Sequence, residues 1–275
     1  MGSLIPARAL PNALGAWPML EARLQGKRVA LFLDYDGTLT PIVASPGKAV
    51  LDPLVRAALE QVASVWPTAI VSGRAREDVE SLVGLPGLVY AGSHGFDVSG
   101  PGGLRLEVAP EALPAIGAAV AELRLRTASV PGALVEDKRY SVAVHYRQVA
   151  DTDLPALARA VEEVAHARPT LRRTDGKRVF ELRPAIDWDK GRALRWMLSA
   201  LVLEAPDVVP VYVGDDLTDE DAFRAVADEG IGILVAQVPW SCTARYVLSD
   251  VGEVRHLLLR LARLGGAVAA DAPAP

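Results

Sequence analysis

The feature that most constrains this chain is an apolar run at residues 29–33 that ends in two carboxylates, Asp34 and Asp36, followed by Gly37. A short apolar run bounded by turn residues is typical of a buried strand in a parallel sheet. Ligands bind beyond the carboxyl ends of such strands, so both carboxylates are expected at the mouth of a site. Alternation along an extended chain puts them on the same side. Gly37 then allows a sharp turn, although an ordinary Asp-rich turn would show the same pattern.

Strands and helices alternate through the first part of the chain. Residues 52–65 carry apolar side chains at helical spacing. Two short strands are expected to end next to Ser72 and His94, at the same edge as Asp34. This rhythm predicts a parallel sheet with right-handed crossovers. The expected strands are residues 29–34, 68–71 and 88–91, and the expected helices are residues 18–24, 52–65 and 76–83.

The rhythm changes after the glycine- and proline-rich residues 99–103, which form a turn signal. The block that follows predicts a compact α+β module of the size of a small domain, with Asp175 and Gly176 as a hairpin cue. Its expected strands begin near residue 104 and continue at 134–138, 141–146, 171 and 179–182, with helices at 111–128 and 154–167.

From Asp189 the parallel rhythm returns, with helices expected at residues 190–203, 220–228 and 254–264 and strands at 208–213 and 231–235. The predicted fold class is therefore α/β. We expect a Rossmann-like core of residues 1–103 and 184–275 and an inserted α+β domain of residues 104–183. A chain of 275 residues is long enough for a core and such an insert.

Four motifs occur in order along the chain. They are Asp34-Tyr35-Asp36-Gly37-Thr38, Ser72-Gly73-Arg74, Asp189-Lys190-Gly191 and Gly214-Asp215-Asp216 with Asp219. Together they resemble the haloacid dehalogenase superfamily of phosphotransferases. Further stretches resemble the trehalose-6-phosphate phosphatase family within it, namely Gly92-Ser93-His94-Gly95, Glu136-x-Lys138, His145-Tyr146-Arg147 and Gly176-Lys177-x-x-x-Glu181. The resemblance implies that the insert is a cap domain placed between the second and third motifs.

The core motifs supply the groups that a phosphoryl transfer needs. Asp34, Asp36 and Asp215 are hard oxygen ligands without a His or Cys cluster, which favours Mg²⁺. Lys190 supplies a compact positive charge for phosphate oxygens, and Ser72 supplies a hydroxyl donor. Positioning and charge stabilisation are the main requirements of such a transfer.

The resemblance implies a role for each catalytic residue. Asp34 attacks phosphorus to form an aspartyl-phosphate, and Asp36 acts first as an acid and then as a base. Lys190 offsets the repulsion between Asp34 and the phosphate. Asp219 orients the loop or the metal shell, with the capping of a helix start as its alternative. The expected metal ligands are Asp34, the main-chain carbonyl of Asp36, Asp215 and, in a secondary shell, Asp216.

The residues that are expected to select the substrate lie in the cap. Glu136 and Lys138 alternate onto one face of a strand, and Lys177 and Glu181 flank another. With the resemblance, all four are expected to contact the sugar, although a charge pair on a half-exposed sheet is the ordinary alternative. We interpret His145 as a partly buried histidine with satisfied hydrogen bonds.

Two core residues, Arg74 and His94, are also expected to contact substrate, because they lie at strand ends where core and cap should meet. The alternative for Arg74 is to cover the helix at residues 77–80. Asp97 stands where relatives often place a glutamate, and a substrate contact from this position is left open.

The leading hypothesis is a Mg²⁺-dependent phosphatase that hydrolyses trehalose 6-phosphate to trehalose and phosphate. A phosphatase of another sugar phosphate, such as sucrose 6-phosphate or a glucosylglycerate phosphate, is the main alternative. A phosphomutase and an inactive sugar-phosphate-binding module are weaker ones, and the presence of Asp34, Asp36 and Lys190 argues against the inactive module.

Charge and cysteine content bear on other partners. The net charge of −5 and the lack of a long basic run argue against nucleic acid and anionic membrane surfaces. The single cysteine, Cys242, excludes an intrachain disulfide and a multi-Cys zinc site. With no signal-peptide pattern and no long apolar run, we expect a cytoplasmic monomer whose partner is a small-molecule sugar phosphate.

Overall fold

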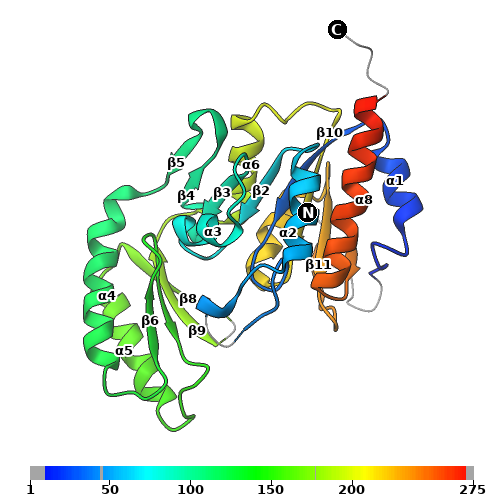
Figure 1. Ribbon diagram of the computed structural model, residues 1–275. Helices are drawn as coiled ribbons and strands as arrows, with labels where there is room; N and C mark the ends of the chain where they lie inside the picture. Colours follow the sequence, from blue (N-terminus) through cyan, green and yellow to red (C-terminus); the bar gives the residue numbers. More distant parts are fainter. Residues whose placement is uncertain (1–9, 44–45, 177, 271–275) are drawn as a thin grey trace.

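Two β-sheets organise the structure, a computed structural model that describes residues 10–43, 46–176 and 178–270 (Figure 1). Lys177, one of the predicted substrate contacts, lies outside the described residues. In spatial order the larger sheet contains β12 (Tyr246–Leu248), β11 (Ile231–Val235), β10 (Val208–Gly214), β1 (Arg28–Leu33), β2 (Thr68–Val71), β3 (Val89–Gly92), β4 (Asp97–Ser99) and β5 (Arg105–Glu107).

The six strands from β12 to β3 run parallel, with β1 near the centre. Leu33 at the end of β1 pairs with Val213 of β10 and with Ile70 of β2. The carboxyl ends of these three strands therefore meet at one edge of the sheet. The residues that follow them, among them Asp34, Ser72 and Asp215, are placed at that edge.

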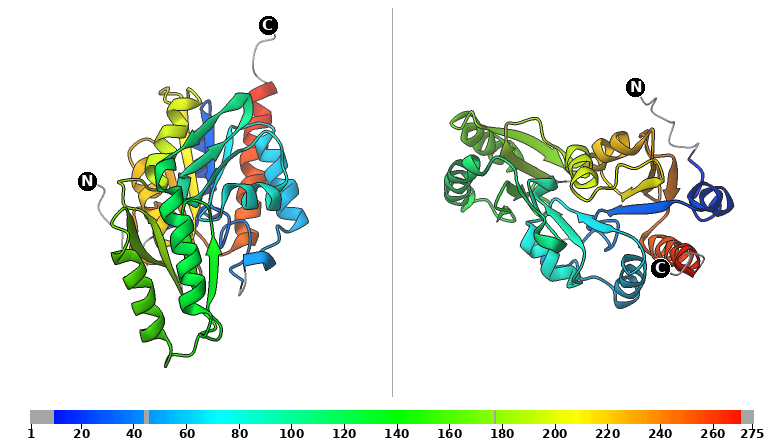
Figure 2. Two further views of the ribbon diagram at one scale, coloured as in Figure 1. Left: turned by 90° about the vertical axis from the view of Figure 1, so that its left-hand side faces the viewer. Right: turned by 90° about the horizontal axis from the view of Figure 1, so that it is seen from above.

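Helices cover both faces of the larger sheet (Figure 2). Alternation along β1 sends Leu31 into one apolar cluster and Phe32 into another on the opposite face. The Leu31 cluster includes side chains of α1 (Trp17–Leu24), α2 (Pro53–Ala63), α3 (Arg76–Val83) and α8 (Val251–Ala270). The Phe32 cluster includes side chains of α6 (Lys190–Ala200) and α7 (Glu220–Val226).

The smaller sheet is antiparallel and, within the described residues, α-helices pack against one of its faces. Its strands, in spatial order, are β6 (Leu134–Asp137), β7 (Val142–His145), β9 (Val179–Pro184) and β8 (Leu171–Gly176). Side chains such as Val144 and Phe180 join a third apolar cluster with α4 (Leu113–Thr127) and α5 (Leu154–His166). On the other face, Glu136, Ala143 and Glu181 form one row across three strands. This alternation leaves the polar face of the smaller sheet available for a ligand.

The predicted α/β class with a parallel-sheet core is confirmed, but the edge of that core differs from the expectation. The glycine-rich turn near residue 100 joins β4 to β5, with a hydrogen bond from the Gly100 amide to the Leu104 carbonyl. Both strands pair antiparallel, so residues 105–107, assigned to the insert from the sequence, belong to the larger sheet. A three-residue edge strand carries no pattern that says which sheet it joins. The division at residues 104 and 183 itself stays a prediction.

The start of α2 provides a test of how local sequence supports this core. The Asp52 side chain accepts hydrogen bonds from the amides of Leu54 and Val55, and Pro53 occupies the first helical position. We predict that Asp52→Ala lowers the free energy of unfolding by about 1 kcal/mol, measured by urea titration. Asp52→Asn keeps an acceptor oxygen and should lose less than half of that, and equal losses in both variants would contradict the capping role.

Candidate active site

A pocket of about 240 Å³ is lined by residues from the edge of the larger sheet and from the polar face of the smaller one. It brings together most of the predicted site residues, namely Asp34, Asp36, Arg74, His94, Glu136, Lys138, Glu181, Lys190, Asp215 and Asp216. Ser72 is not part of its lining. The Ser72 hydroxyl is buried and accepts a hydrogen bond from the Arg74 amide, so in this structure it shapes the loop behind the pocket.

Lys190 is the first residue of α6, whose N-cap, Asp189, accepts a hydrogen bond from the Arg192 amide. The buried Lys190 ammonium donates to Asp34 Oδ1 at 2.8 Å and to Asp219 Oδ1 at 2.7 Å. Burial by itself lowers the pKa of Lys190, but the two carboxylates outweigh burial and leave that pKa well above its usual value. Lys190 is therefore a permanent positive charge beside Asp34.

Asp219 is completely buried, and all of its acceptor positions serve the site. Besides Lys190, its Oδ1 accepts from the Tyr212 hydroxyl at 2.6 Å, and its Oδ2 accepts from the amides of Asp215 and Asp216. The sequence left open whether Asp219 orients the loop or caps a helix start. In the structure its contacts with the two amides do both. The sequence does not indicate that Asp219 pairs with Lys190, because the two residues are 29 positions apart.

Three carboxylates, those of Asp34, Asp215 and Asp219, each offer an oxygen within 4.8 Å of the others. Burial raises the pKa of Asp34, Asp219 and Asp215 raise it further, and Lys190 opposes them. Lys190 alone is shared by two of these carboxylates, those of Asp34 and Asp219, so a cation would relieve the negative charge around it. Gly37 leaves room for this, because a Cβ there would lie 2.2 Å from Asp215 Oδ2. An all-oxygen set with an acidic excess fits Mg²⁺.

Asp216, predicted as a secondary metal ligand, is the N-cap of the short helix η6 (Leu217–Asp219), where its Oδ1 accepts from the Leu217 amide. Its role toward a metal stays a prediction. Asp36, predicted to contribute its main-chain carbonyl, lies in the tight turn after β1, where the Gly37 amide donates to the Thr40 carbonyl.

Arg74 forms a fork on the carboxylate of Asp36, with Nε and a terminal nitrogen 2.7 and 2.8 Å from its two oxygens. A second terminal nitrogen donates to Asp78 of α3, and the guanidinium lies over the Tyr35 ring. The contact with the next helix is the alternative that the sequence left open for Arg74. Arg74 also lines the pocket, and its contact with substrate stays a prediction. A bidentate contact of this kind sets the orientation of the Asp36 carboxyl group.

The smaller sheet carries Glu181, the centre of a second buried charge cluster. The Glu181 carboxylate lies 3.3 Å from the Lys138 ammonium, 3.1 Å from His94 Nε2 and 2.8 Å from the Ser141 hydroxyl. Burial alone raises the pKa of Glu181, but Lys138 and His94 oppose it and leave the pKa well below the usual value. Burial lowers the pKa of His94, against the pull of Glu181. The lack of a side chain at Gly73 admits the His94 ring.

His145 lines the pocket, which sequence analysis did not predict. Its Nε2 lies 2.6 Å from Glu136 Oε2. The two residues sit on adjacent strands in which Leu134 pairs with His145, so they are diagonal neighbours on one face. The earlier interpretation of His145 as a partly buried, hydrogen-bonded histidine describes its environment but not its position in the pocket. Predicting the contact between His145 and Glu136 requires the register of β6 and β7, which the sequence does not reveal.

Comparison with known families agrees with this geometry. The trehalose-phosphatase family profile matches residues 32–251, which covers most of the chain. A probable trehalose-phosphate phosphatase of Oryza sativa subsp. japonica is 44% identical over 261 residues, which cover 92% of this chain and 71% of the relative. The chain belongs to the trehalose-phosphatase family. Trehalose 6-phosphate phosphatase RA3 of Zea mays is 42% identical over 94% of this chain and 76% of its own length.

Solved structures in and around the trehalose-phosphatase family share the fold. A trehalose-6-phosphate phosphatase related protein matches with a TM-score of 0.77 at 26% identity, over 86% of this chain and 99% of that one. The C-terminal domain of the C. albicans trehalose-6-phosphate phosphatase matches with a TM-score of 0.79 at 21% identity, over 93% and 99% of the two chains. A haloacid dehalogenase-like hydrolase from Bacteroides thetaiotaomicron also shares the fold, with a TM-score of 0.61 at 14% identity.

Asp97, the position at which this member of the family departs from the expected glutamate, does not line the pocket. It is almost fully buried on β4 and contacts Arg76, Arg105 and Arg139. In this structure its carboxylate belongs to an ion cluster beside the pocket. In the described part of the chain, no helix combines the length and apolar character that crossing a membrane requires.

We predict that Asp219→Asn lowers the free energy of unfolding by about 3 kcal/mol, because an amide nitrogen replaces one of the two buried oxygens that accept from Lys190, Tyr212 and two loop amides. Buried donors are then left without an acceptor. Asp221→Asn is the matched control. It removes a carboxylate from the first turn of α7, where Asp221 is half-buried and paired with Arg224. Urea unfolding followed by circular dichroism measures both variants. Similar losses in the two would mean that Asp219 acts only through the helix terminus.

Proposed function

We propose that this protein hydrolyses trehalose 6-phosphate to trehalose and inorganic phosphate. The observation that carries the proposal is the composition of the pocket, in which the Asp34–Lys190 pair lies on one side and the Lys138–Glu181 pair on the other. The first pair suits a phosphate ester, and the second suits the hydroxyl groups of a sugar. Membership of the trehalose-phosphatase family supports trehalose as that sugar.

In the first step, an oxygen of Asp34 attacks phosphorus while the bond from phosphorus to the sugar oxygen breaks. The hydrogen bond to Lys190 engages Asp34 Oδ1 and fixes the orientation of this carboxylate. Asp36 donates a proton to the leaving sugar oxygen, oriented by the fork of Arg74. The products of this step are free trehalose and an aspartyl-phosphate at Asp34.

In the second step, water attacks the phosphorus of the aspartyl-phosphate. Asp36, now ionised, accepts a proton from that water, and the bond from phosphorus to the Asp34 oxygen breaks. Inorganic phosphate leaves and both carboxyl groups return to their starting states. Throughout, Lys190 keeps a positive charge next to the phosphoryl oxygens, because its raised pKa prevents loss of its proton near neutral pH.

We propose Mg²⁺ as the cofactor, held by Asp34, Asp215 and the main-chain carbonyl of Asp36. When bound, the ion stabilises negative charge on the phosphoryl oxygens. Asp219 serves as the support of this site, because its oxygens are engaged by Lys190, Tyr212 and two loop amides. We also propose that the protein works as a monomer in the cytoplasm, where the buried Cys242 would stay a free thiol.

The function is tested by phosphate release from trehalose 6-phosphate, sucrose 6-phosphate, a glucosylglycerate phosphate and p-nitrophenyl phosphate. We expect the highest kcat/KM with trehalose 6-phosphate, loss of activity in EDTA and recovery with Mg²⁺. A higher kcat/KM for another sugar phosphate would contradict the substrate assignment, and full activity after exhaustive chelation would contradict the metal.

We predict that Asp34→Asn lowers kcat on trehalose 6-phosphate by on the order of a thousandfold or more, because an amide oxygen cannot act as the nucleophile. Circular dichroism should show an unchanged fold. Asp187→Asn, at an exposed carboxylate outside the pocket, is the control and should retain wild-type activity. Substantial turnover by purified Asp34→Asn would remove this residue from the nucleophile role.

We predict that Glu181→Gln weakens transition-state binding of trehalose 6-phosphate by about 2 kcal/mol, because the variant loses a charged acceptor inside the pocket. Hydrolysis of p-nitrophenyl phosphate, which carries no sugar hydroxyls, should change much less. Glu163→Gln, at an exposed carboxylate of the cap helix α5 paired with Arg126, is the matched control. Equal losses on both substrates would assign Glu181 to folding or to the core chemistry.

A further inference from the structure

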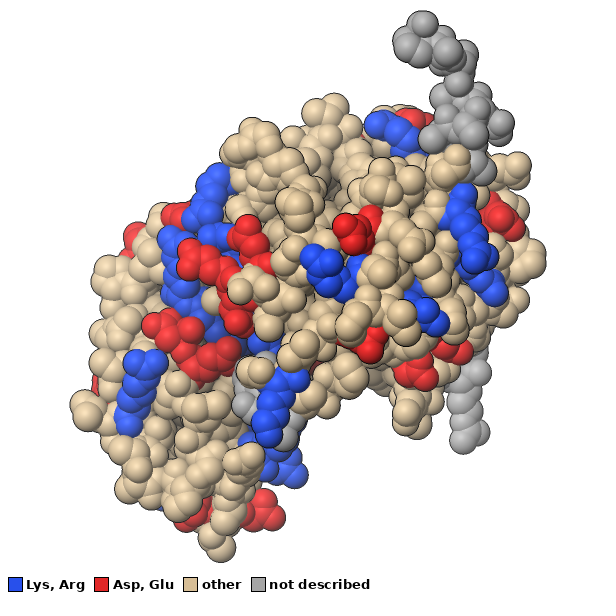
Figure 3. Space-filling model, in the orientation of Figure 1, with Lys and Arg blue, Asp and Glu red and all other residues tan. Residues whose placement is uncertain are grey.

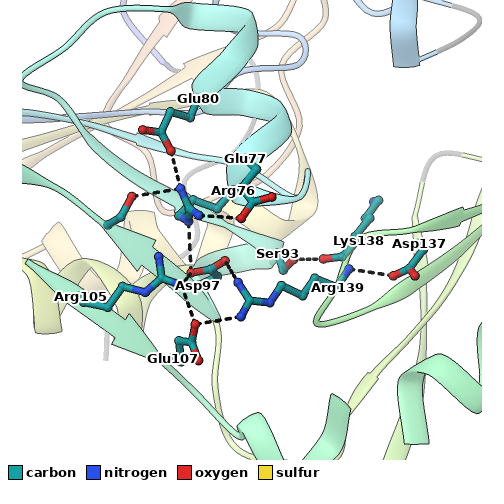
Figure 4. Close-up of polar contacts among 11 residues, drawn as sticks. Arg76, Glu77, Glu80, Ser93, Asp97, Arg105, Glu107, Asp137, Lys138 and Arg139 are labelled. Atoms are coloured by element: carbon teal, nitrogen blue, oxygen red, sulfur yellow. Dashed lines mark hydrogen bonds and ion pairs between the residues drawn. The ribbon is translucent and has the colours of Figure 1, made fainter. Parts of the chain in front are cut away.

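The tip of the β6–β7 hairpin, residues 138–141, carries two basic side chains that go in opposite directions (Figure 4). The Lys138 ammonium lies in the pocket next to Glu181, with 13% of the side chain exposed. Arg139, the next residue, adopts a left-handed backbone conformation with φ of 65° and extends toward the edge of the larger sheet. The Arg139 amide donates to the Asp137 side chain, which stabilises this turn.

The Arg139 guanidinium contacts two carboxylates of the core. It lies 3.1 Å from Asp97 Oδ2 on β4 and 2.9 Å from Glu107 Oε1 on β5. Asp97 is only 2% exposed, and its other two ion-pair partners, Arg76 and Arg105, come from the core itself. Arg139 is thus the contribution of the smaller sheet to a charge cluster that otherwise belongs to the larger one. Figure 3 shows acidic and basic side chains gathered together over this region.

A second contact holds the same tip at the backbone of Lys138. The Ser93 hydroxyl donates to the main-chain carbonyl of Lys138 at 2.6 Å. Ser93 adjoins His94, which contacts Glu181. The backbone of Lys138 is therefore held by the core at its own carbonyl and, through the next residue, at Asp97 and Glu107.

We propose that Arg139 is a positioning residue for substrate binding, holding the hairpin tip against the core so that the Lys138 ammonium stays beside Glu181 in the pocket. The inference rests on the proposed function, because it takes this pocket to be the sugar-phosphate site. Arg139 does not line the pocket, so its effect on the substrate passes through Lys138. A residue that acts in this way should alter KM more than kcat.

Arg105 offers a matched control for Arg139. Both guanidiniums contact Asp97 and Glu107, and both side chains are similarly exposed, at 42% for Arg105 and 38% for Arg139. Arg105 lies on β5 within the larger sheet, so its removal weakens the same cluster without releasing the hairpin tip. The comparison separates positioning of Lys138 from a general loss of charge at Asp97.

The first measurement is steady-state kinetics with trehalose 6-phosphate. Arg139→Ala should raise KM roughly five- to tenfold with kcat within about twofold, whereas Arg105→Ala should leave both near wild type. Arg139→Lys keeps the charge but loses the fork that reaches two carboxylates, so its KM should lie between those of wild type and Arg139→Ala. Equal increases in KM in Arg139→Ala and Arg105→Ala would overturn the proposal.

The second measurement is amide hydrogen exchange without substrate, which does not depend on the activity. The Lys138 amide donates to the Ser141 carbonyl and the Tyr140 amide to the Lys138 carbonyl. Exchange at both should be at least about fivefold faster in Arg139→Ala and unchanged in Arg105→Ala. Wild-type protection in Arg139→Ala would overturn the proposal. Failure of the wild-type protein to hydrolyse trehalose 6-phosphate would instead reject the proposed function, and exchange would still decide whether Arg139 positions the tip.

Discussion

The Lys190 ammonium, buried between the carboxylates of Asp34 and Asp219, is the interaction on which the arrangement of the site depends. Asp34 follows β1, Lys190 begins α6, and Asp219 ends the short helix after β10, so one charge joins three parts of the chain. A buried ammonium is tolerated only when carboxylates compensate it, and here the compensation exceeds the charge. The excess of negative charge lies at the pocket, where a bound cation would reduce it. A phosphate group would then meet less repulsion from the carboxylates.

A second buried charge cluster lies across the pocket, around Glu181, and it is shared between core and cap. Lys138 and Ser141 come from the cap hairpin, whereas His94 comes from the end of the core strand β3. The Glu181 cluster is therefore not a property of the smaller sheet alone. The relative placement of the two sheets determines whether the Glu181 carboxylate keeps its partners. In the function that we propose, contacts between the two sheets thereby become part of substrate recognition.

The sequence predicted the residues that follow parallel strands well, because such strands end at one edge and their motifs mark those ends. Asp34, Lys190 and Asp215 meet as expected although the first two are 156 residues apart. It predicted the pairing of side chains less well. Whether His145 meets Glu136 depends on the register of β6 and β7, and whether β5 extends the core depends on a three-residue pairing. Asp219 illustrates a further limit of sequence-based prediction. Its one carboxylate accepts from two loop amides and also pairs with Lys190, and a local sequence pattern indicates only the first role.

The surroundings of Asp97 also depend on strand register. Asp97 and Glu107 are directly paired across β4 and β5, and like charges in that relation destabilise a sheet edge. Arg76 and Arg105 offset part of this repulsion from within the core, and Arg139 adds a positive charge from the cap. The edge strands thus gain stability from the cap, and the cap tip gains its position from the edge strands. In our proposal, the Asp97 carboxylate serves substrate binding indirectly, through Arg139 and the placement of Lys138.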